Sequence, residues 1–407
     1  MRLTLLNQFY APDISPTAQL AASLAEHRAS LGDDVTVIAG RAGYLEGLGP
    51  ERLEETLVRV RRAWTPDLGK SSIPRRVLGY LSYLVGSTAR VLLLPRQDVI
   101  VVMTTPPLVV VVALLHKLLH RRTRVVLWSM DCYPDVAERF GELATGGPVS
   151  RLLRAITRRA FRHLDHVVAL DGAMAELLTS QYAAAEGRPP CTIVPNWERA
   201  ELFPAGDGPA SPWEGLVELV PSDVRAGKVL VVYLGNIGVG HRFDTVVDAA
   251  EQLSDEAIFL FVGGGARRDA LVEAAAARGL ENLVVHGYVA KPATPRLLAA
   301  ADAALITLDD RSLGVISPSK LHANLAAGLP VLYVGPRHSN VDEAIERFGC
   351  GTSLREGEVA ELVAAVRTIG SEPPAERAAR RARSRAAFDA AYCDTATLPR
   401  FDAILAG

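Results

Sequence analysis

The sequence predicts an α/β protein built from two doubly wound domains, each with a parallel sheet, that face each other across a cleft. Short apolar runs rich in Val, Ile and Leu alternate with amphipathic stretches of helical length along the chain. A stretch rich in Pro, Gly and Ser interrupts this alternation once, after Pro195. With 407 residues, 49% of them hydrophobic, the chain is long enough for two domains with complete cores.

The first domain is predicted over residues 1–197. It opens with a strand at Leu3–Asn7, a helix at about 17–30 and a strand at Asp34–Ala39, the βαβ unit with which doubly wound domains begin. Further strands are expected at Val99–Met103, Arg124–Ser129, His166–Leu170 and Thr192–Val194. Helices are expected between them at Arg75–Leu94, Leu108–Leu119 and Arg151–His163.

A linker is predicted over residues 198–227, followed by the second domain at 228–385 and a helical tail at 386–407 that packs back on the first domain. The β-branched run Lys228–Leu234 begins the second domain. Its later strands are expected at Ala257–Val262, Asn282–His286, Ala304–Leu308 and Pro330–Tyr333. Such sheets bind ligands at the carboxyl ends of their strands, so we expect the active site in the cleft between the domains.

The segment around residue 320 has the features of an anion site. Ser317 followed by Pro318 indicates a helix start, because serine can cap and proline at the first position lacks only an orphan N–H. Ser319 and Lys320 would then lie in the first turn, where lysine opposes the helix dipole unless an anion is bound. A solvated lysine in an ordinary βαβ unit explains these residues equally well.

Glycine-rich turns at the same strand ends favour a nucleotide diphosphate. Gly235 and Gly238 follow one strand, where missing side chains let backbone N–H groups approach an anion. Gly263–Gly265 follow the next strand, in a turn that allows a nucleoside to approach closely. Asn236 adds a donor, and Arg242 offers a planar guanidinium suited to phosphate oxygens. Each glycine turn alone is weak evidence for a nucleotide, since tight turns also use glycine for geometry.

The first domain offers a carboxylate at a comparable position. Asp131 lies just past a strand end, where it can face a substrate, although an Asp that forms a turn before Tyr133 and Pro134 is the alternative. Three residues of the loop after the first strand can line a substrate cleft or serve as turn and cap residues: Tyr10, Ser15 and Thr17.

Charge is distributed unevenly, and it indicates an anionic partner for the first domain. Residues 51–165 contain 19 Lys and Arg against 10 Asp and Glu. Residues 70–96 alternate basic and apolar groups, which predicts an amphipathic helix that contacts an anionic membrane surface or packs on the sheet. The apolar run Leu108–Leu115 is too short to cross a bilayer. Aromatic residues do not interleave the basic runs, so nucleic acid is not an expected partner.

The cysteine pattern and the start of the chain indicate the compartment. The four cysteines are scattered, with no Cys-x-x-Cys pair and no nearby His cluster, so neither a disulfide framework nor a zinc site is expected. The opening segment MRLTLLNQFYAP is too short and too quickly polar for a signal peptide, and we expect it to form the first strand. We therefore expect a cytoplasmic protein, peripheral at the inner membrane face if residues 70–96 bind lipid.

Taken together, these segments resemble the retaining family 4 glycosyltransferases of the GT-B fold. The second-domain segments are LGNIGVGHRFDTVVDAAEQL, FLFVGGGARRD, VVHGYVAK and GVISPSKLHANLAAGLPVL. In the first domain, FYAPDISPTAQ, TTPP, WSMDCYPDVAERFG and VPNW are similar to the branch that assembles surface polysaccharides and glycolipids. The resemblance implies a nucleotide sugar as co-substrate, a UDP-sugar being favoured, with no separate cofactor and no metal.

The resemblance also implies roles for individual residues. It implies that the donor diphosphate is held by Gly235, Asn236, Gly238, Arg242, Ser319 and Lys320. Tyr288 and Val289 would lie near the base, and Asp131 would line the sugar and acceptor cleft. Gly263, Gly264 and Ser317 complete the donor-binding candidates from the turn and helix-start patterns.

One feature departs from the family pattern. The family usually carries a Glu-x7-Glu pair whose second Glu grips the ribose, and the corresponding residues here are Val315 and Ala323. Asn324 lies close to them and remains a donor-binding candidate, although it does not replace a carboxylate. The missing pair leaves open a non-catalytic subunit that binds a nucleotide sugar.

The favoured hypothesis is a metal-independent, retaining hexosyltransferase acting on a lipid-linked or surface-glycan acceptor. Its catalytic candidates are Asp131, Arg242 and Lys320. A transferase with a soluble natural-product acceptor, the non-catalytic binding subunit and a nucleotide-sugar epimerase are the alternatives.

Overall fold

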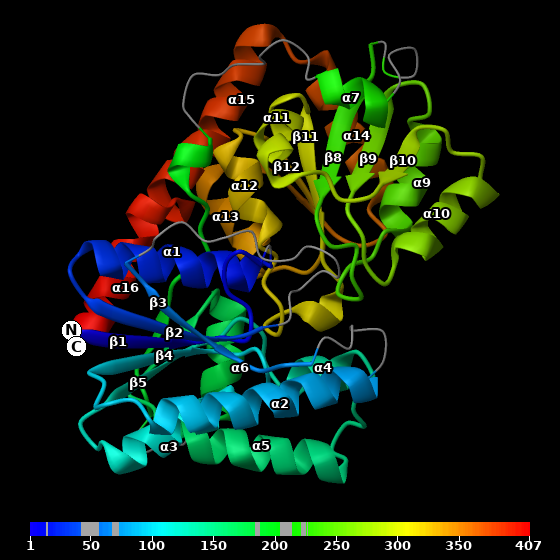
Figure 1. Cartoon of the computed structure of the whole chain (residues 1–407). Helices are drawn as coiled ribbons and strands as arrows, with labels where there is room; N and C mark the ends of the chain where they lie inside the picture. Colours follow the sequence, from blue (N-terminus) through cyan, green and yellow to red (C-terminus); the bar gives the residue numbers. More distant parts are fainter. Residues whose placement is uncertain are drawn as a thin grey trace. The chain divides into compact units, whose positions relative to one another are not determined.

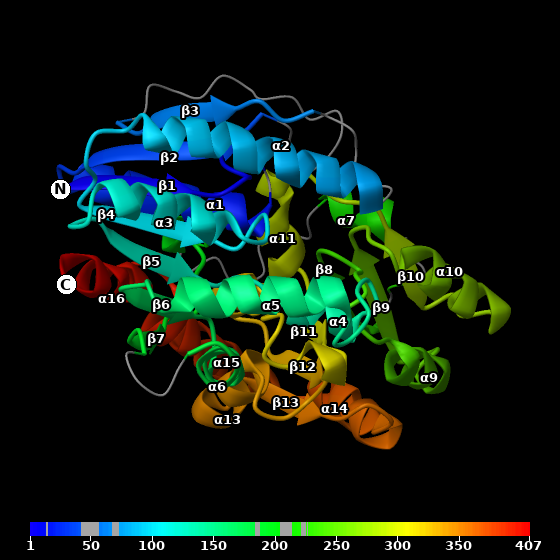
Figure 2. The same cartoon turned by 90° about the horizontal axis from the view of Figure 1, so that it is seen from below.

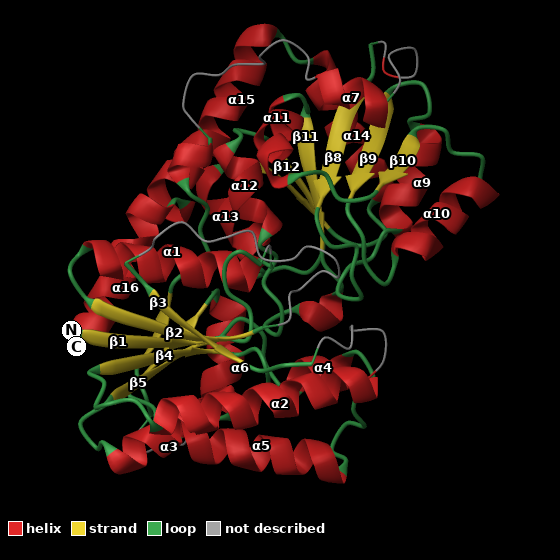
Figure 3. Ribbon diagram, viewed as in Figure 1, coloured by secondary structure: helices red, strands yellow, loops and turns green. Residues whose placement is uncertain are grey.

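The computed structural model describes residues 1–13, 15–41, 57–66, 73–183, 188–203, 214–220, 225 and 227–407. These residues form two compact units, each with its own parallel sheet and helices (Figure 3). The first unit comprises Met1–Pro195, Gly314–Ser317 and Leu398–Gly407. The second unit comprises Asn196–Leu313 and Pro318–Thr397. The predicted fold class, two doubly wound parallel-sheet domains, is confirmed.

The first unit is organised around a seven-stranded sheet with the order β3-β2-β1-β4-β5-β6-β7, in which every neighbouring pair is parallel. Central strands such as β4 are buried along their whole length, because helices cover both faces of a parallel sheet. The strands are β1 (Arg2–Leu6), β2 (Asp34–Gly40), β3 (Arg59–Ala63), β4 (Val99–Met103), β5 (Arg124–Trp128), β6 (His166–Ala169) and β7 (Cys191–Ile193).

Helices α2, α3 and α5 lie along one face of this sheet, and α1 lies on the other (Figures 1 and 2). The helices are α1 (Pro16–Ser30), α2 (Ile73–Leu92), α3 (Val109–Leu119), α4 (Asp135–Arg139), α5 (Pro148–Phe161) and α6 (Gly172–Gln181). None of the helices in the described part of the chain combines the length and apolar character required to span a membrane.

The strand β3 is absent from the sequence-based prediction. Its sequence, RVRRA, contains three arginines, and only Ala63 is buried. An edge strand pairs on one side only, so it requires less burial than a central strand. It therefore lacks the continuous apolar run by which central strands are predicted. The strands that were predicted individually agree with the structure to within one residue at each end.

The second unit has a six-stranded sheet with the order β10-β9-β8-β11-β12-β13, again with parallel neighbours. Its strands are β8 (Val229–Leu234), β9 (Ala257–Val262), β10 (Leu283–His286), β11 (Ala303–Thr307), β12 (Val331–Val334) and β13 (Gly351–Leu354). Its α-helices are α7 (Glu214–Leu219), α9 (Asp244–Gln252), α10 (Arg268–Ala277), α11 (Thr294–Ala299), α12 (Lys320–Ala326), α13 (Asn340–Phe348), α14 (Val359–Ser371), α15 (Pro374–Ala387) and α16 (Asp394–Ala406), whose last residues belong to the first unit. Short 3-10 turns occur at η1 (Ala200–Leu202), η2 (Lys291–Ala293) and η3 (Asp310–Ser312), and η4 (Phe388–Tyr392) is a π-helical turn.

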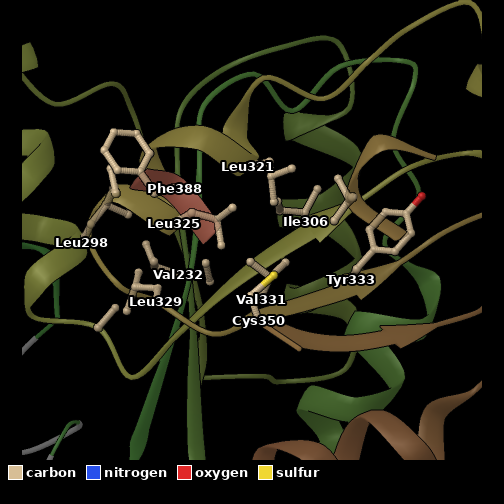
Figure 4. Close-up of a cluster of buried hydrophobic side chains, with 14 of the residues drawn as sticks. Val232, Leu298, Ile306, Leu321, Leu325, Leu329, Val331, Tyr333, Cys350 and Phe388 are labelled. Atoms are coloured by element: carbon tan, nitrogen blue, oxygen red, sulfur yellow. The ribbon is translucent and has the colours of Figure 1, made fainter. Parts of the chain in front are cut away.

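A hydrophobic cluster fixes α12 against this sheet. Figure 4 shows Leu321 and Leu325 of α12 among side chains of the strands, including Ile306 and Val331, with Phe388 of η4 nearby. All five side chains are fully buried. Full burial of a side chain of this size stabilises the fold by about 1.5–3 kcal/mol. The cluster therefore anchors the helix that begins with Lys320.

Segment 198–227, predicted to be a linker, contributes to the second unit. In its described part, Phe203, Leu216 and Val220 are buried in the hydrophobic cluster of that unit. The many Pro, Gly and Ser residues of this segment obscure its apolar anchors, of which only Leu216 and Val220 have helical spacing. The predicted tail 386–407 is divided, because residues up to Thr397 cluster with the second unit and those from Leu398 cluster with the first.

Candidate functional site

Two loops at the carboxyl ends of β8 and β9 pair through their backbones. The N–H of Gly235 donates to the carbonyl oxygen of Val262 at 2.8 Å, and the N–H of Ile237 donates to that of Gly264 at 2.7 Å. These bonds extend the parallel pairing of β8 and β9 beyond the ends of the strands. The loops thus form one rigid rim at the sheet edge where doubly wound domains bind ligands.

The glycines of this rim are required by close packing. A Cβ atom added to Gly263 would overlap the carbonyl oxygen of Gly235, and one added to Gly265 would overlap the side chain of Asn236. Both glycines have positive φ values, 154° and 141°, which side chains disfavour. Gly263 and Gly265 are therefore required for the close contact between the loop after β9 and the loop after β8. The sequence-based interpretation, in which this turn makes room for a nucleoside, had no means of detecting that contact.

Asn236 organises the first of these loops. Its carboxamide lies over Gly238, where an added Cβ would be 2.7 Å from Asn236 Nδ2. Its backbone carbonyl accepts a hydrogen bond from the Tyr233 hydroxyl at 2.8 Å and another from Lys320 Nζ at 3.1 Å. The predicted residues Gly235, Asn236, Gly238 and Lys320 are thereby brought together.

Lys320 is the cation of this site. Its Nζ lies 4.7 Å from the centre of the Tyr233 ring and 3.2 Å from Nε2 of His241. Burial lowers the pKa of the ammonium to about 7. Among the described residues, no carboxylate forms a salt bridge with Lys320. A partly buried cation without an acidic partner is suited to an anionic ligand.

Arg242, the other predicted diphosphate cation, has acidic neighbours. Its guanidinium is 3.3 Å from a carboxylate oxygen of Asp244 and 3.9 Å from one of Glu356. Glu356 is the main cause of the raised pKa of this arginine, whose side chain is 44% exposed. In this arrangement two acids neutralise Arg242, so Lys320 carries the stronger case for anion binding.

The predicted helix start at Ser317 and Pro318 is wrong. The helix begins at Lys320, and Ser319 occupies the cap position without a side-chain hydrogen bond. The Ser317 hydroxyl instead hydrogen-bonds to Asp171, the capping residue of α6 in the first unit, to which Ser317 belongs. This distant carboxylate competes for the hydroxyl, which the local Ser-Pro pattern does not reveal.

The remaining donor-binding candidates differ in exposure. Tyr288 is 49% exposed, and its hydroxyl donates to the carbonyl oxygen of Gly264 at 3.4 Å. Val289 packs against the hydrophobic cluster, and Asn324 is buried. Val315 and Ala323, at the positions of the missing carboxylates, are respectively buried and half-buried.

Asp131 lies in a separate, polar and aromatic environment in the first unit. Its backbone N–H and that of Met130 both donate to the hydroxyl of Thr104, each at 3.0 Å, so the TTPP turn after β4 holds the loop after β5. Burial raises the pKa of the Asp131 carboxyl to about 6, and the phenols of Tyr80 and Tyr133 lie near it. A cavity of about 50 Å³ is lined in part by Thr104, Asp131 and Tyr133. Asp131 can therefore exchange a proton near neutral pH.

The three acceptor-side candidates in the loop before α1 have mainly structural contacts. The Ser15 hydroxyl caps α1 by accepting the N–H of Ala18 at 3.3 Å. The Tyr10 side chain is buried, and its carbonyl accepts hydrogen bonds from Arg62. Thr17 retains a partly exposed side chain.

His241 and Arg267 belong to this site but were not among the candidates. His241 contacts Lys320. The charge of Arg267 contributes to lowering the pKa of His241, and the Arg267 backbone N–H donates to the carbonyl oxygen of Ile237. No local pattern identifies either residue, because their partners are distant in sequence. Within the described ranges, no group of three His, Cys, Asp or Glu side chains is arranged to hold a metal ion.

Two segments of the chain match models of known families. Residues 17–197 match the family model of the glycosyl transferase 4-like domain. Residues 228–371 match the model of the glycosyl transferases group 1. The two matches do not overlap and are separated by residues 198–227, in agreement with the two sheets.

Individual relatives extend this similarity to nearly the whole chain. A protein of Escherichia coli K12, provisionally named the colanic acid biosynthesis glycosyl transferase WcaI, is 26% identical over 382 residues, covering 90% of this chain and 91% of that protein. Sucrose-phosphate synthase from Thermosynechococcus elongatus superimposes with a TM-score of 0.74 at 14% identity, covering 99% and 98% of the two chains. Anabaena HepE, in complex with UDP and glucose, superimposes with a TM-score of 0.71 at 17% identity over both complete chains.

Proposed function

We propose that this chain is a glycosyltransferase of the GT-B fold, which transfers a sugar from a nucleotide diphosphate donor to a lipid-linked or surface-glycan acceptor. The observation that carries the donor site is Lys320, a partly buried cation at the glycine rim with no carboxylate partner among the described residues. A UDP-sugar is the favoured donor, since HepE has the same fold and was crystallised with UDP-glucose. The colanic acid assignment of WcaI supports a surface-glycan product.

The proposed chemistry relies on fixed positive charge. Lys320 would stabilise the negative charge that grows on the leaving diphosphate, as preorganised electrostatic catalysis requires. Transfer would retain the anomeric configuration, with an oxygen of the leaving phosphate taking the proton of the acceptor hydroxyl. Asp131 is the candidate for orienting the acceptor, and no metal is required for these steps.

A basic and apolar helical face supports a lipid-linked acceptor at the cytoplasmic side of a membrane. We define this face as α2, α3 and α5, which lie side by side on the first sheet (Figure 2). These three helices contain no Asp or Glu. Apolar side chains exposed on them include Leu81, Val85, Leu118 and Leu152. Exposed apolar groups among cations suit an anionic lipid surface.

The donor proposal is tested by binding. Thermal unfolding is measured with UDP, GDP, ADP and dTDP and their common sugars, followed by donor hydrolysis for each ligand that stabilises the protein. We expect UDP to stabilise the wild type and Lys320→Ala to lose about 2–5 kcal/mol of binding free energy, as for other buried charged contacts. Stabilisation without turnover would favour the non-catalytic binding subunit suggested by Val315 and Ala323. No response to any nucleotide would refute the donor site.

The role of Asp131 is tested by Asp131→Asn. This change preserves size and removes the titrating carboxyl, so we expect turnover to fall by about 10²–10⁴-fold with UDP affinity nearly unchanged. The measurement is the transfer rate at saturating donor, alongside UDP calorimetry. Unchanged turnover would exclude Asp131 from the reaction.

A further inference from the structure

His241 links the backbone of β11 to the ammonium of Lys320. Its Nδ1 lies 2.6 Å from the carbonyl oxygen of Thr307, and its Nε2 lies 3.2 Å from Nζ of Lys320. A carbonyl oxygen only accepts, so Nδ1 must carry the proton of the first contact. An ammonium only donates, so Nε2 must be the unprotonated acceptor of the second. The two contacts together select a neutral ring in one tautomer.

The surroundings of the ring maintain this state. His241 is buried, with Tyr233 edge-on at 5.8 Å between ring centres and Phe243 stacked at 6.3 Å. The charged groups that face it are Lys320, Arg267 before α10 and Asp309 after β11. Burial and the Lys320 charge lower the pKa of His241 well below its usual value. The ring therefore stays neutral while Lys320 titrates.

The geometry leaves Lys320 with one N–H group for a ligand. An ammonium has three N–H donors, and the carbonyl of Asn236 and Nε2 of His241 accept two of them. The third has no hydrogen-bond acceptor among the described residues. These two acceptors belong to the rigid rim and to a ring held on three sides, so they also define the direction of the third donor.

We propose that His241 is a positioning residue, whose neutral ring holds the Lys320 ammonium so that its third N–H points at the donor diphosphate. This inference rests on the proposed function, in which Lys320 is the diphosphate cation. His241 does not touch the donor in this arrangement, and it acts through Lys320 alone.

Removal of the acceptor nitrogen of His241 should destabilise the protonated form of Lys320. Burial already lowers the pKa of this lysine to about 7, and the hydrogen bond to His241 opposes that effect. Without Nε2 the ammonium loses one of two acceptors, so its pKa should fall further. The diphosphate binds the protonated form, so UDP affinity should decline at a lower pH than in the wild type.

Matched variants separate positioning from packing. His241→Asn can keep the donor to Thr307 but lacks an acceptor at the Nε2 position, whereas His241→Gln can return an acceptor to Lys320. His241→Leu keeps apolar contact with Tyr233 and Phe243, and it replaces the Asn variant if that variant does not fold. His166→Gln is the control, because this half-buried histidine belongs to the first unit, hydrogen-bonds to Thr192 and has no contact with Lys320 among the described residues.

The first readout needs no ligand. The chain has five lysines, Lys70, Lys117, Lys228, Lys291 and Lys320, so a lysine-selective ¹³C label allows the Lys320 signal to be assigned with Lys320→Arg. We expect His241→Asn to lower the Lys320 titration midpoint by about one pH unit, from the loss of one charge-assisted hydrogen bond. His241→Gln should restore the midpoint, and His166→Gln should leave it unchanged.

The second readout is UDP affinity as a function of pH, measured by calorimetry. At about pH 8 the His241→Asn variant should bind UDP about tenfold more weakly than the wild type, and at about pH 6 within about twofold. An unchanged or raised midpoint in His241→Asn, or no restoration by Gln, would overturn the positioning role. A lowered midpoint in a protein that binds no UDP at any pH would support the Lys320–His241 unit and refute the proposed donor.

Discussion

At the scale of single residues, neighbouring glycines of one turn have different physical roles. Gly263 and Gly265 hold the loop after β9 against the loop after β8, because an added Cβ would overlap atoms of Gly235 and Asn236. Gly264 faces the ring of Tyr288 instead, at 3.0 Å from the position of an added Cβ. Gly287, after β10, has open space around that position. The rim that contacts Lys320 therefore depends on specific glycines.

We predict that Gly263→Ala destabilises the second unit by about 2–4 kcal/mol, from backbone strain at positive φ and overlap with a carbonyl oxygen. UDP binding should also weaken, because the overlap displaces the loop after β8, whose Asn236 carbonyl accepts a hydrogen bond from Lys320. Thermal unfolding and UDP calorimetry measure both effects. Gly287→Ala is the matched control and should change neither. Equal behaviour of the two variants would contradict the packing role of Gly263.

At the scale of elements, the helical face of α2, α3 and α5 differs from an ordinary solvated surface. Solvent-exposed helices usually mix both signs of charge, whereas these three carry basic residues without acidic ones. Arg151, Arg158 and Arg159 of α5 are exposed close to the apolar Leu152 in sequence. Exposed apolar side chains among basic residues are typical of a helical face that contacts a lipid surface.

We predict that Leu81→Asp and Leu152→Asp each weaken binding to vesicles containing anionic lipid by more than about tenfold. Each change removes an apolar side chain worth about 1.5–3 kcal/mol on full burial and adds a repelled charge. The two leucines are 53% and 60% exposed, so folding should be preserved. Co-sedimentation measures binding, and Leu31→Asp, at a residue 58% exposed after α1, is the control. Retained binding by both variants would count against this face.

At the scale of the whole molecule, the first unit is assembled from separate pieces of chain. Its sheet is complete by β7, yet the last residues of α16 also belong to it. The Phe401 ring lies edge-on to Trp128 of β5 at 4.6 Å between centres, and the Arg124 guanidinium donates to the carbonyl oxygens of Ile404 and Leu405 at 3.0 and 2.9 Å. The end of the chain therefore completes the core of its beginning.

We predict that Phe401→Ala destabilises the first unit by about 3–5 kcal/mol, because a fully buried aromatic ring is lost. Hydrogen exchange should accelerate in β1, β4 and β5, while β8 and β9 of the second unit keep their protection. Ala403→Ser, at an exposed position of the same helix, should leave exchange unchanged. Uniform acceleration across both units would argue against this local role.

The sequence by itself determined the order and type of most elements. Strands buried on both faces must be apolar, and the helices that cover them must be amphipathic, so both leave local patterns in the sequence. The same logic located Gly235 and Asn236 at a strand end and Lys320 at a helix start. It could not detect β3, whose edge position tolerates RVRRA, or the buried anchor Phe203 within a Pro- and Gly-rich segment.

Only the tertiary structure decided which charged groups are free to act. Lys320 and Arg242 have equivalent standing in the sequence, yet Arg242 lies near Glu356, far along the chain, and Lys320 meets His241 instead. The sequence likewise predicts that Ser317 caps a helix, but its hydroxyl hydrogen-bonds to Asp171. Local patterns record propensity and burial, whereas charge pairing depends on distances between residues remote in sequence, which folding alone sets.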